Sequence, residues 1–117
     1  MTPETAPRGA DHAIEIDFSG AASQAAMHEL LQRAFGFPDF YGRNFHALVD
    51  CWSSLRSPED GMSTITLPDV AGTLTIHAHG LTTLERDALF VLVGAIQDVN
   101  RRELHNGHSP MIYLLPA

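Results

Sequence analysis

Basic residues are scarce in this chain. Lysine and arginine together number 7 against 14 aspartates and glutamates, which gives a formal net charge of −7 over 117 residues. Proteins that follow the phosphates of a nucleic acid are held there by lysine and arginine, so this charge balance argues against direct nucleic-acid binding. A basic protein is the better expected partner, although an acidic surplus also serves solubility and does not indicate a fold.

Cysteine is nearly absent as well. Because Cys51 stands alone in the sequence, the chain cannot form an internal disulfide, and its cysteine usage does not indicate an oxidising compartment. A buried, unreactive thiol is the more frequent role for such a residue, and a reactive thiol is the alternative. The first twelve residues lack the pattern of a signal peptide, and no apolar run approaches the ~20 residues of a membrane span. We therefore expect a cytoplasmic protein that makes no membrane contact.

The familiar catalytic signatures are missing too. The sequence contains no G-x-S-x-G elbow, no G-x-x-x-x-G-K-[ST] loop, no G-x-G-x-x-G and no H-E-x-x-H. Their absence disfavours an enzyme, although a pair of carboxylates can act without any motif. We expect a protein without catalytic residues and without a cofactor.

Alternation of apolar and polar residues predicts strands. Residues 13–18 (AIEIDF) and 73–78 (TLTIHA) place apolar side chains on one face and polar side chains on the other, whereas 111–115 (MIYLL) is apolar on both faces. A further extended piece at 63–69 would be confined to a sheet edge by Pro68. The sequence thus predicts three main strands.

Helical spacing predicts three helices between these strands. The first ends at Gly36, and the second begins after Asn44, whose side chain can bond the free amides of the first turn. The third is expected to begin near Thr83, because Thr82 and Glu85 fit a capping box, and to end near residue 105. Each helix carries apolar residues for a core.

The order strand, helix, helix, strand, helix, strand predicts an α/β fold. Strands joined by helical crossovers are parallel, and the polar face of the first two strands leaves the other face for the helices. We expect a two-layer domain over residues 13–117, with a small three-stranded parallel sheet and helices mainly on one face. A flexible N-terminal tail over residues 1–12 would precede it.

A metal site is one possible use of the seven histidines. His77 and His79 share one face of a predicted strand, and Glu15 or Asp17 of another strand could complete a set of histidine and carboxylate ligands. An ordinary solvated sheet face explains the same residues, and ligand spacing this loose is frequent by chance. The predicted binding residues therefore include no metal ligand.

The stretch FPDFYGRNFHALVD, residues 37–50, gathers aromatic residues at the start of the second helix. Tyrosine and phenylalanine give large contact areas at low entropic cost, and an exposed carboxylate such as Asp50 can bond to arginine as a phosphate does. His46 lies one turn before Asp50 on the same face. The alternative is that Phe37, Phe40 and Tyr41 simply cover the end of the core.

Residues 38–52, PDFYGRNFHALVDCW, resemble the P-x-Y-Y-G-x-N-L-x-A-L-W-D-C segment of the barstar-like intracellular ribonuclease inhibitors. The order of elements from about residue 13 onwards also resembles that family. The resemblance implies a three-stranded parallel sheet packed against helices, and an inhibitor that plugs a ribonuclease active site with its second helix and the preceding loop. It further implies that Asp50 fills the phosphate site of the enzyme.

The same resemblance implies the contact residues. Phe40, His46 and Val49 depart from the family pattern, where a tyrosine, an aspartate and a tryptophan stand. A match that depends on a gap places Asp98 as the acidic contact on the last helix, where Gly94 would leave room for close approach. The predicted partner-binding residues are Phe40, Tyr41, Gly42, Arg43, Asn44, His46, Ala47, Val49, Asp50 and Asp98.

The sequence therefore predicts an inhibitor that forms a 1:1 complex with a small, basic, secreted-type ribonuclease. It would act by steric occlusion and electrostatic mimicry, without covalent chemistry. One alternative is a barstar-like immunity module for a toxin or effector that is not a ribonuclease. The other is a metal protein that uses the histidines of the second strand.

Overall fold

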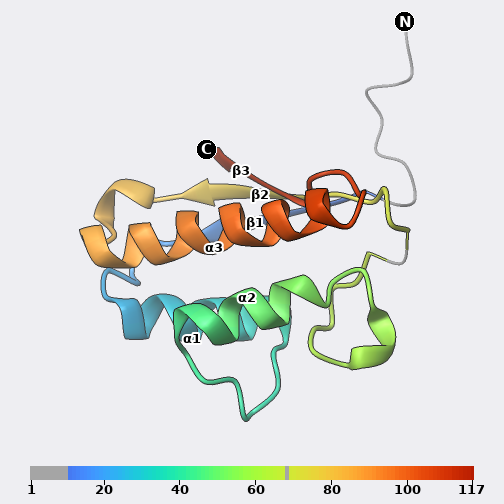
Figure 1. Cartoon of the computed structure of the whole chain (residues 1–117). Coiled ribbons are helices and arrows are strands. Elements are labelled where there is room, and N and C mark those ends of the chain that lie inside the picture. The colour runs from blue at the N-terminus through green and yellow to red at the C-terminus, as the bar shows by residue number, and fades with distance from the viewer. Residues whose placement is uncertain (1–10, 68) are drawn as a thin grey trace, which may run out of the picture.

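A computed structural model describes residues 11–67 and 69–117 of the chain. Within these residues, the fold has three strands and three α-helices, with two short 3₁₀ helices in the connections (Figure 1). In chain order the elements are β1 (His12–Asp17), α1 (Gln24–Phe35), α2 (Phe45–Ser53), η2 (Pro58–Asp60), β2 (Leu74–His79), η3 (Leu81–Thr83), α3 (Arg86–His105) and β3 (Ile112–Pro116).

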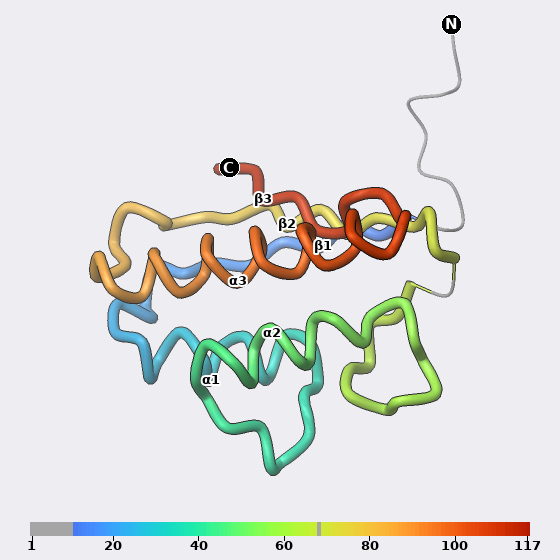
Figure 2. The backbone as a smooth tube through the Cα atoms, in the orientation of Figure 1, coloured from blue at the N-terminus to red at the C-terminus, as the bar shows by residue number. Residues whose placement is uncertain are grey.

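The sheet is parallel throughout, in the order β1-β2-β3. Ile14 lies beside Ile76, which in turn lies beside Leu114. All three helices lie on one side of this sheet (Figure 2). The predicted two-layer α/β architecture is confirmed.

Alternation along the strands explains why the helices cover that one face. Ile16 of β1 and Leu74 and Ile76 of β2 are buried beneath the helices, whereas Glu15 and Asp17 are exposed. The open face also carries Tyr113 and Leu115, both exposed, as expected for a third strand that is apolar on both sides. Burial of the inward set, with Trp52 and Phe18 among the largest members of the core, supplies the main driving force for folding.

The start of the third helix differs from the prediction. α3 begins at Arg86, and Glu85 is its N-cap with an extended backbone and no capping side-chain bond. The hydroxyl of the neighbouring Thr83 donates to the carbonyls of Gly80 and Phe18, at 2.7 and 3.2 Å. Gly80 has a left-handed backbone, φ +72°, and turns the chain into a short 3₁₀ helix, so Thr82 lies in that helix and not at the start of α3.

The predicted extended piece at 63–69 is not a strand in the residues that the structure describes; Pro68 lies outside them. The segment bonds instead to the end of α1 and to the turn that follows α2. Thr64 N donates to the carbonyl of Phe35 at 2.8 Å, and Leu67 N donates to that of Leu55 at 2.6 Å. Because carbonyls at the end of a helix have no partner within the helix, they compete with sheet pairing for these amides.

The predicted N-terminal tail, residues 1–12, falls mostly outside the described residues. Its last two residues belong to the folded part, since β1 begins at His12. The His12 amide donates to the carbonyl of Thr73 at 2.8 Å, and the Thr73 hydroxyl donates to Asp11 at 3.2 Å. The extent of the tail and of the domain before residue 11 stays a prediction.

A buried ion pair holds three connections together. The Arg56 guanidinium lies 2.7 Å from Glu103 of α3, with side-chain exposures of 4 % and 10 %. Arg56 also donates to the backbone carbonyls of Gly72, Ser109 and Pro110. Five donors in a rigid, planar group suit such a multiple contact, and the hydrogen bonds compensate the removal of both charges from water.

We predict that Arg56→Ala lowers the free energy of unfolding by about 3 kcal/mol or more, because the substitution leaves Glu103 charged and buried without its partner. Urea denaturation followed by circular dichroism measures the change. Arg86→Ala, which removes the same charge from an exposed position, is the control and should shift stability by less than ~0.5 kcal/mol. Equal effects of the two substitutions would contradict this role for Arg56.

Candidate functional site

The candidate site is built on the loop of residues 36–44 and on α2, which follows it. Gly36 ends α1 with a left-handed backbone, φ +66°. Asn44 caps α2 as predicted, since its side-chain oxygen accepts a hydrogen bond from the Ala47 amide at 2.8 Å. The loop therefore leaves one helix and enters the next at fixed points, and it projects away from the rest of the fold (Figure 1).

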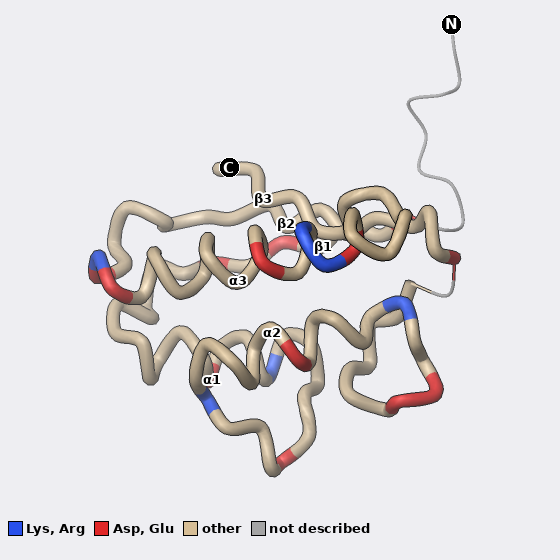
Figure 3. The backbone as a smooth tube through the Cα atoms, in the orientation of Figure 1, with Lys and Arg blue, Asp and Glu red and all other residues tan. Residues whose placement is uncertain are grey.

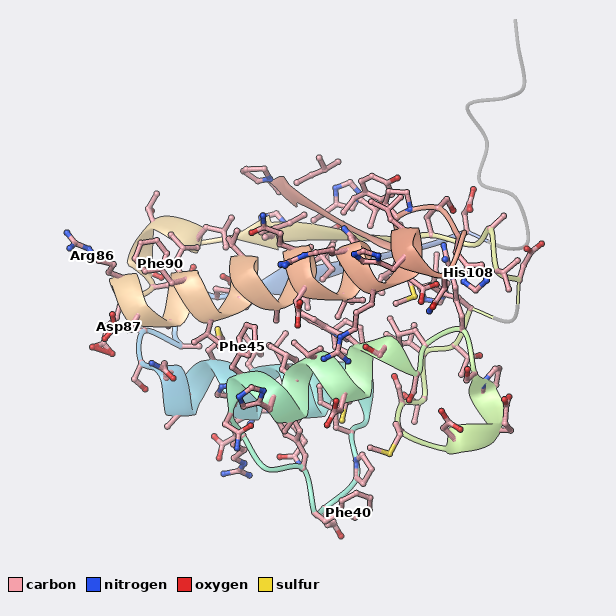
Figure 4. The ribbon with its side chains drawn as sticks, in the orientation of Figure 1. Phe40, Phe45, Arg86, Asp87, Phe90 and His108 are labelled. Carbon is pink, nitrogen blue, oxygen red and sulfur yellow. The ribbon has the colours of Figure 1, made fainter. Side chains whose placement is uncertain are left out.

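The aromatic residues of the loop divide into two roles. Phe37 is buried and stacks on Phe35, with ring centroids 5.4 Å apart, so it covers the core. Phe40 is 76 % exposed and lies at the tip of the loop, pointing into solvent (Figure 4). Covering of the core thus explains Phe37 but leaves Phe40 unexplained, and an exposed phenylalanine on a projecting loop is typical of a contact residue.

Tyr41 is buried, with 6 % exposure, and its hydroxyl lies 2.6 Å from Nδ1 of His28 on α1. The hydroxyl is bonded inside the protein, which satisfies the need of a buried tyrosine for a polar partner. Burial raises the pKa of Tyr41 far above its ordinary value, and burial followed by the charge of Arg43 lowers the pKa of His28. His28 Nε2 has no hydrogen-bond partner, so a charged imidazole is disfavoured here.

Asp50 projects outward from α2. Its side chain is 70 % exposed, and His46, one turn earlier, is exposed on the same helix. A hollow of about 160 Å³ opens beside the carboxylate, and Phe40, Tyr41, Gly42 and Ala47 contribute to its walls. An accessible acid beside a small apolar hollow can receive a partner side chain that has a basic head and an apolar stem.

The predicted residues do not all reach the surface. Val49 is 1 % exposed, so its side chain belongs to the core and the prediction that it contacts a partner does not fit its burial. Cys51 is buried too, and burial followed by the nearby Asp50 charge raises the thiol pKa to about 11, which makes it unreactive. Of the remaining predicted contacts, Tyr41 is buried, Ala47 and Asp98 are half-buried, and Phe40, Gly42, Arg43, Asn44, His46 and Asp50 are exposed.

Asp98 of α3 comes close to Asp50 through a residue that the sequence interpretation missed. Arg102 lies 3.9 Å from Asp50 and 3.7 Å from Asp98, so its guanidinium stands between the two carboxylates. The spacing of Asp98 and Arg102, four residues apart on one helix, could have indicated their contact. The room at Gly94 serves a different purpose from the predicted one, because Phe45 of α2 occupies it.

Arginines gather around these acids. The chain has seven arginines and no lysine. Among the described residues five arginines are exposed; Arg43 is itself a predicted contact, and Arg101 and Arg102 pair with Asp98. Figure 3 shows basic and acidic segments side by side on α3. The site is therefore mixed in charge, although the chain as a whole is acidic.

On the open face of the sheet, a histidine of β2 contacts a carboxylate of β1. His79 Nε2 lies 2.8 Å from a Glu15 carboxylate oxygen, which makes a two-residue contact between neighbouring strands. Over residues 11–67 and 69–117, no three histidine, cysteine or carboxylate side chains are placed to hold a metal ion. Within those same ranges, no helix has the length and apolar character that crossing a membrane requires.

Comparison with known protein families agrees with the observed fold, and the matched region includes the segment around Asp50. The model of the family described as Barstar (barnase inhibitor) matches residues 11–114. The chain belongs to the Barstar family. Among curated proteins, none matches the chain significantly.

Membership of the Barstar family implies a function like that of a ribonuclease inhibitor and binding of a barnase-like ribonuclease. Members of the Barstar family are inhibitors and not enzymes, which agrees with the missing catalytic signatures. The match also covers β1, all three helices and most of β3, so it agrees with the observed parallel sheet and its helical layer.

We predict that acidification lowers the free energy of unfolding of this Barstar family protein, and that His28 is the residue responsible. Because its pKa is lower in the folded state than the ordinary 6.5, the unfolded chain takes up a proton first, and stability is lost as the pH falls below about 6.5. The uptake of one proton on unfolding changes the free energy of unfolding by at most about 1.4 kcal/mol per pH unit. In His28→Gln, the free energy of unfolding measured by urea denaturation should depend less on pH between pH 7 and pH 5.

His46→Gln is the control for this measurement, since His46 is exposed. The control should keep the slope of the unsubstituted protein. If His28→Gln and His46→Gln show the same slope, the buried imidazole is not the group that titrates.

Proposed function

We propose that this protein inhibits a basic, barnase-like ribonuclease by blocking its active site with α2 and the loop of residues 36–44, in a 1:1 complex. The observation that carries the proposal is the position of Asp50, which projects from α2 with 70 % of its side chain exposed beside a small hollow. A carboxylate in that position can replace an RNA phosphate among the cations of a nuclease.

The surroundings of Asp50 support a contact surface of this kind. Phe40 gives an exposed aromatic ring on one side of the hollow, and Gly42 brings the backbone close to the surface. Asn44 and His46 supply polar groups at the first turn of α2. A large apolar anchor beside a charged group, with polar residues around them, is the usual composition of a strong binding site between proteins.

Net charge supports the encounter step. A chain of net charge −7 attracts a basic nuclease over distances of about 10 Å at ordinary ionic strength, which speeds association. Barstar, the inhibitor that gives this family its name, and its target barnase are the standard example of such steering, so this expectation follows from the family. Occlusion then needs no chemical step, in agreement with a family of inhibitors.

The mixed charge of the site favours one alternative. Arg102 lies 3.9 Å from Asp50, and Arg43 is exposed in the loop before α2, where a uniformly basic cleft would repel both. A toxin or effector that presents both cations and carboxylates would fit this surface better. Such a partner, with or without ribonuclease activity, is the second candidate.

We predict that Asp50→Ala weakens binding to barnase by at least about 2 kcal/mol, or roughly 30-fold in Kd, because the cations of the nuclease lose their charged partner. Surface plasmon resonance measures the affinity. Asp87→Ala is the control, since it removes the same charge from the first turn of α3, about 16 Å along the helix from Asp98. Unchanged affinity in Asp50→Ala would count against the proposed function.

We also predict that Arg102→Gln increases the rate of association with barnase by about threefold or more at low salt, because a cation between Asp50 and Asp98 opposes a basic partner. Arg86→Gln is the matched control, about 24 Å away along α3. Stopped-flow fluorescence at two salt concentrations measures both rates. Equal rates for the two variants at low salt would show that Arg102 has no special position in the encounter.

A further inference from the structure

The loop of residues 36–44 presents a physical difficulty. It projects beyond the helices, and its tip carries the exposed Phe40 (Figure 4). A flexible loop would lose conformational entropy when it is fixed against a partner, and this loss would weaken the complex. If the loop takes part in binding, a group that fixes its shape in the free protein increases the affinity.

One side chain of α1 bonds to both ends of the projecting part of this loop. Gln32 Nε2 donates to the carbonyl of Pro38 at 2.9 Å, where the projection begins. Gln32 Oε1 accepts from Nε and Nη2 of Arg43, at 3.3 and 3.1 Å, where the projection ends. The donor and the acceptor of one amide thus join positions that lie five residues apart in the chain.

The two bonded positions are the ones that determine the shape of the loop. The Pro38 carbonyl also accepts the Tyr41 amide at 2.9 Å, which closes the turn that carries Phe40. Arg43 has φ +52°, and it is the one non-glycine residue with a left-handed backbone in the described part of the chain. This conformation is unfavourable for arginine by itself, so contacts of its side chain help to maintain it.

The conformation of Arg43 determines where α2 starts. Asn44, the N-cap, follows directly, and α2 then carries His46 and Asp50 outward. Glu29 adds a charged contact to Arg43 at 3.9 Å, on the same face of α1 as Gln32. Gln32 therefore lies behind the contact surface and acts on it through Arg43 and Pro38.

We propose that Gln32 is a positioning residue for inhibition, which holds the loop of residues 36–44 in its binding shape before a partner arrives. The inference rests on the proposed function. Gln32 differs from the other anchor of the loop, the buried contact between Tyr41 and His28, because it is only half-buried and lies outside the apolar core. Its removal leaves the core packing in place, so its effect on the loop can be separated from its effect on folding.

The test is Gln32→Ala in the full chain, with Gln97→Ala on the exposed face of α3 as the matched control. Without a partner, amide hydrogen exchange at residues 39–44 should become roughly fivefold faster or more in Gln32→Ala, while exchange in α3 stays unchanged. With barnase as the probe, dissociation should become about tenfold faster, because the loop must be ordered in the complex. Gln97→Ala should change neither measurement.

Gln32→Glu separates the effects of the two hydrogen bonds, since a carboxylate keeps the acceptor for Arg43 but loses the donor to Pro38. Its exchange rates should fall between those of the unsubstituted protein and Gln32→Ala. Unchanged exchange at residues 39–44 in Gln32→Ala would overturn the proposal, as would faster exchange with unchanged dissociation from barnase. Failure of the proposed function has a different result: Asp50→Ala would then keep full affinity, whatever the exchange measurements give.

Discussion

The contact between Tyr41 and His28 is the constraint on which the candidate site depends. It places one residue of the projecting loop inside the core, and the ring of Tyr41 also packs on Phe37 with centroids 4.9 Å apart. With both of these residues held inward, the chain between them has to turn outward, and Phe40 is exposed as a result. The core therefore determines which aromatic residue of the loop meets solvent.

The arginine that stabilises the fold differs from the arginines beside the candidate site. Arg56 is buried and bonds to Glu103 and to three backbone carbonyls, so its charge serves the fold. Arg101 and Arg102 are more than half exposed, and ion pairs of this kind contribute little to stability. Their charges act instead on the field that an approaching protein meets, where they partly neutralise the acids that would attract it.

Local patterns in the sequence predicted the elements well, because strand alternation and the Asn44 cap depend on neighbouring residues alone. The capping box at Thr82 and Glu85 failed because the left-handed turn at Gly80 leads into a 3₁₀ helix that contains Thr82, and Glu85 itself becomes the N-cap of α3. The position of Arg102 between two carboxylates was also beyond prediction, since α2 and α3 meet only in the folded chain. The burial of Val49 was not predicted for the same reason: the helical pattern of α2 does not show which of its residues a neighbouring element covers.

The edge of the sheet at β3 is poorly suited to pairing with a further strand. An exposed edge strand invites another strand to pair with it. On β3, Asn100 bonds to the amides of Met111 and Ile112, at 2.8 and 2.9 Å, and to the carbonyl of Ile112 at 2.9 Å. Pro116 at the end of β3 has no N–H to offer. Pairing along this edge is thereby opposed, whereas the projecting loop and α2 present an exposed phenylalanine and carboxylate for a specific contact by side chains.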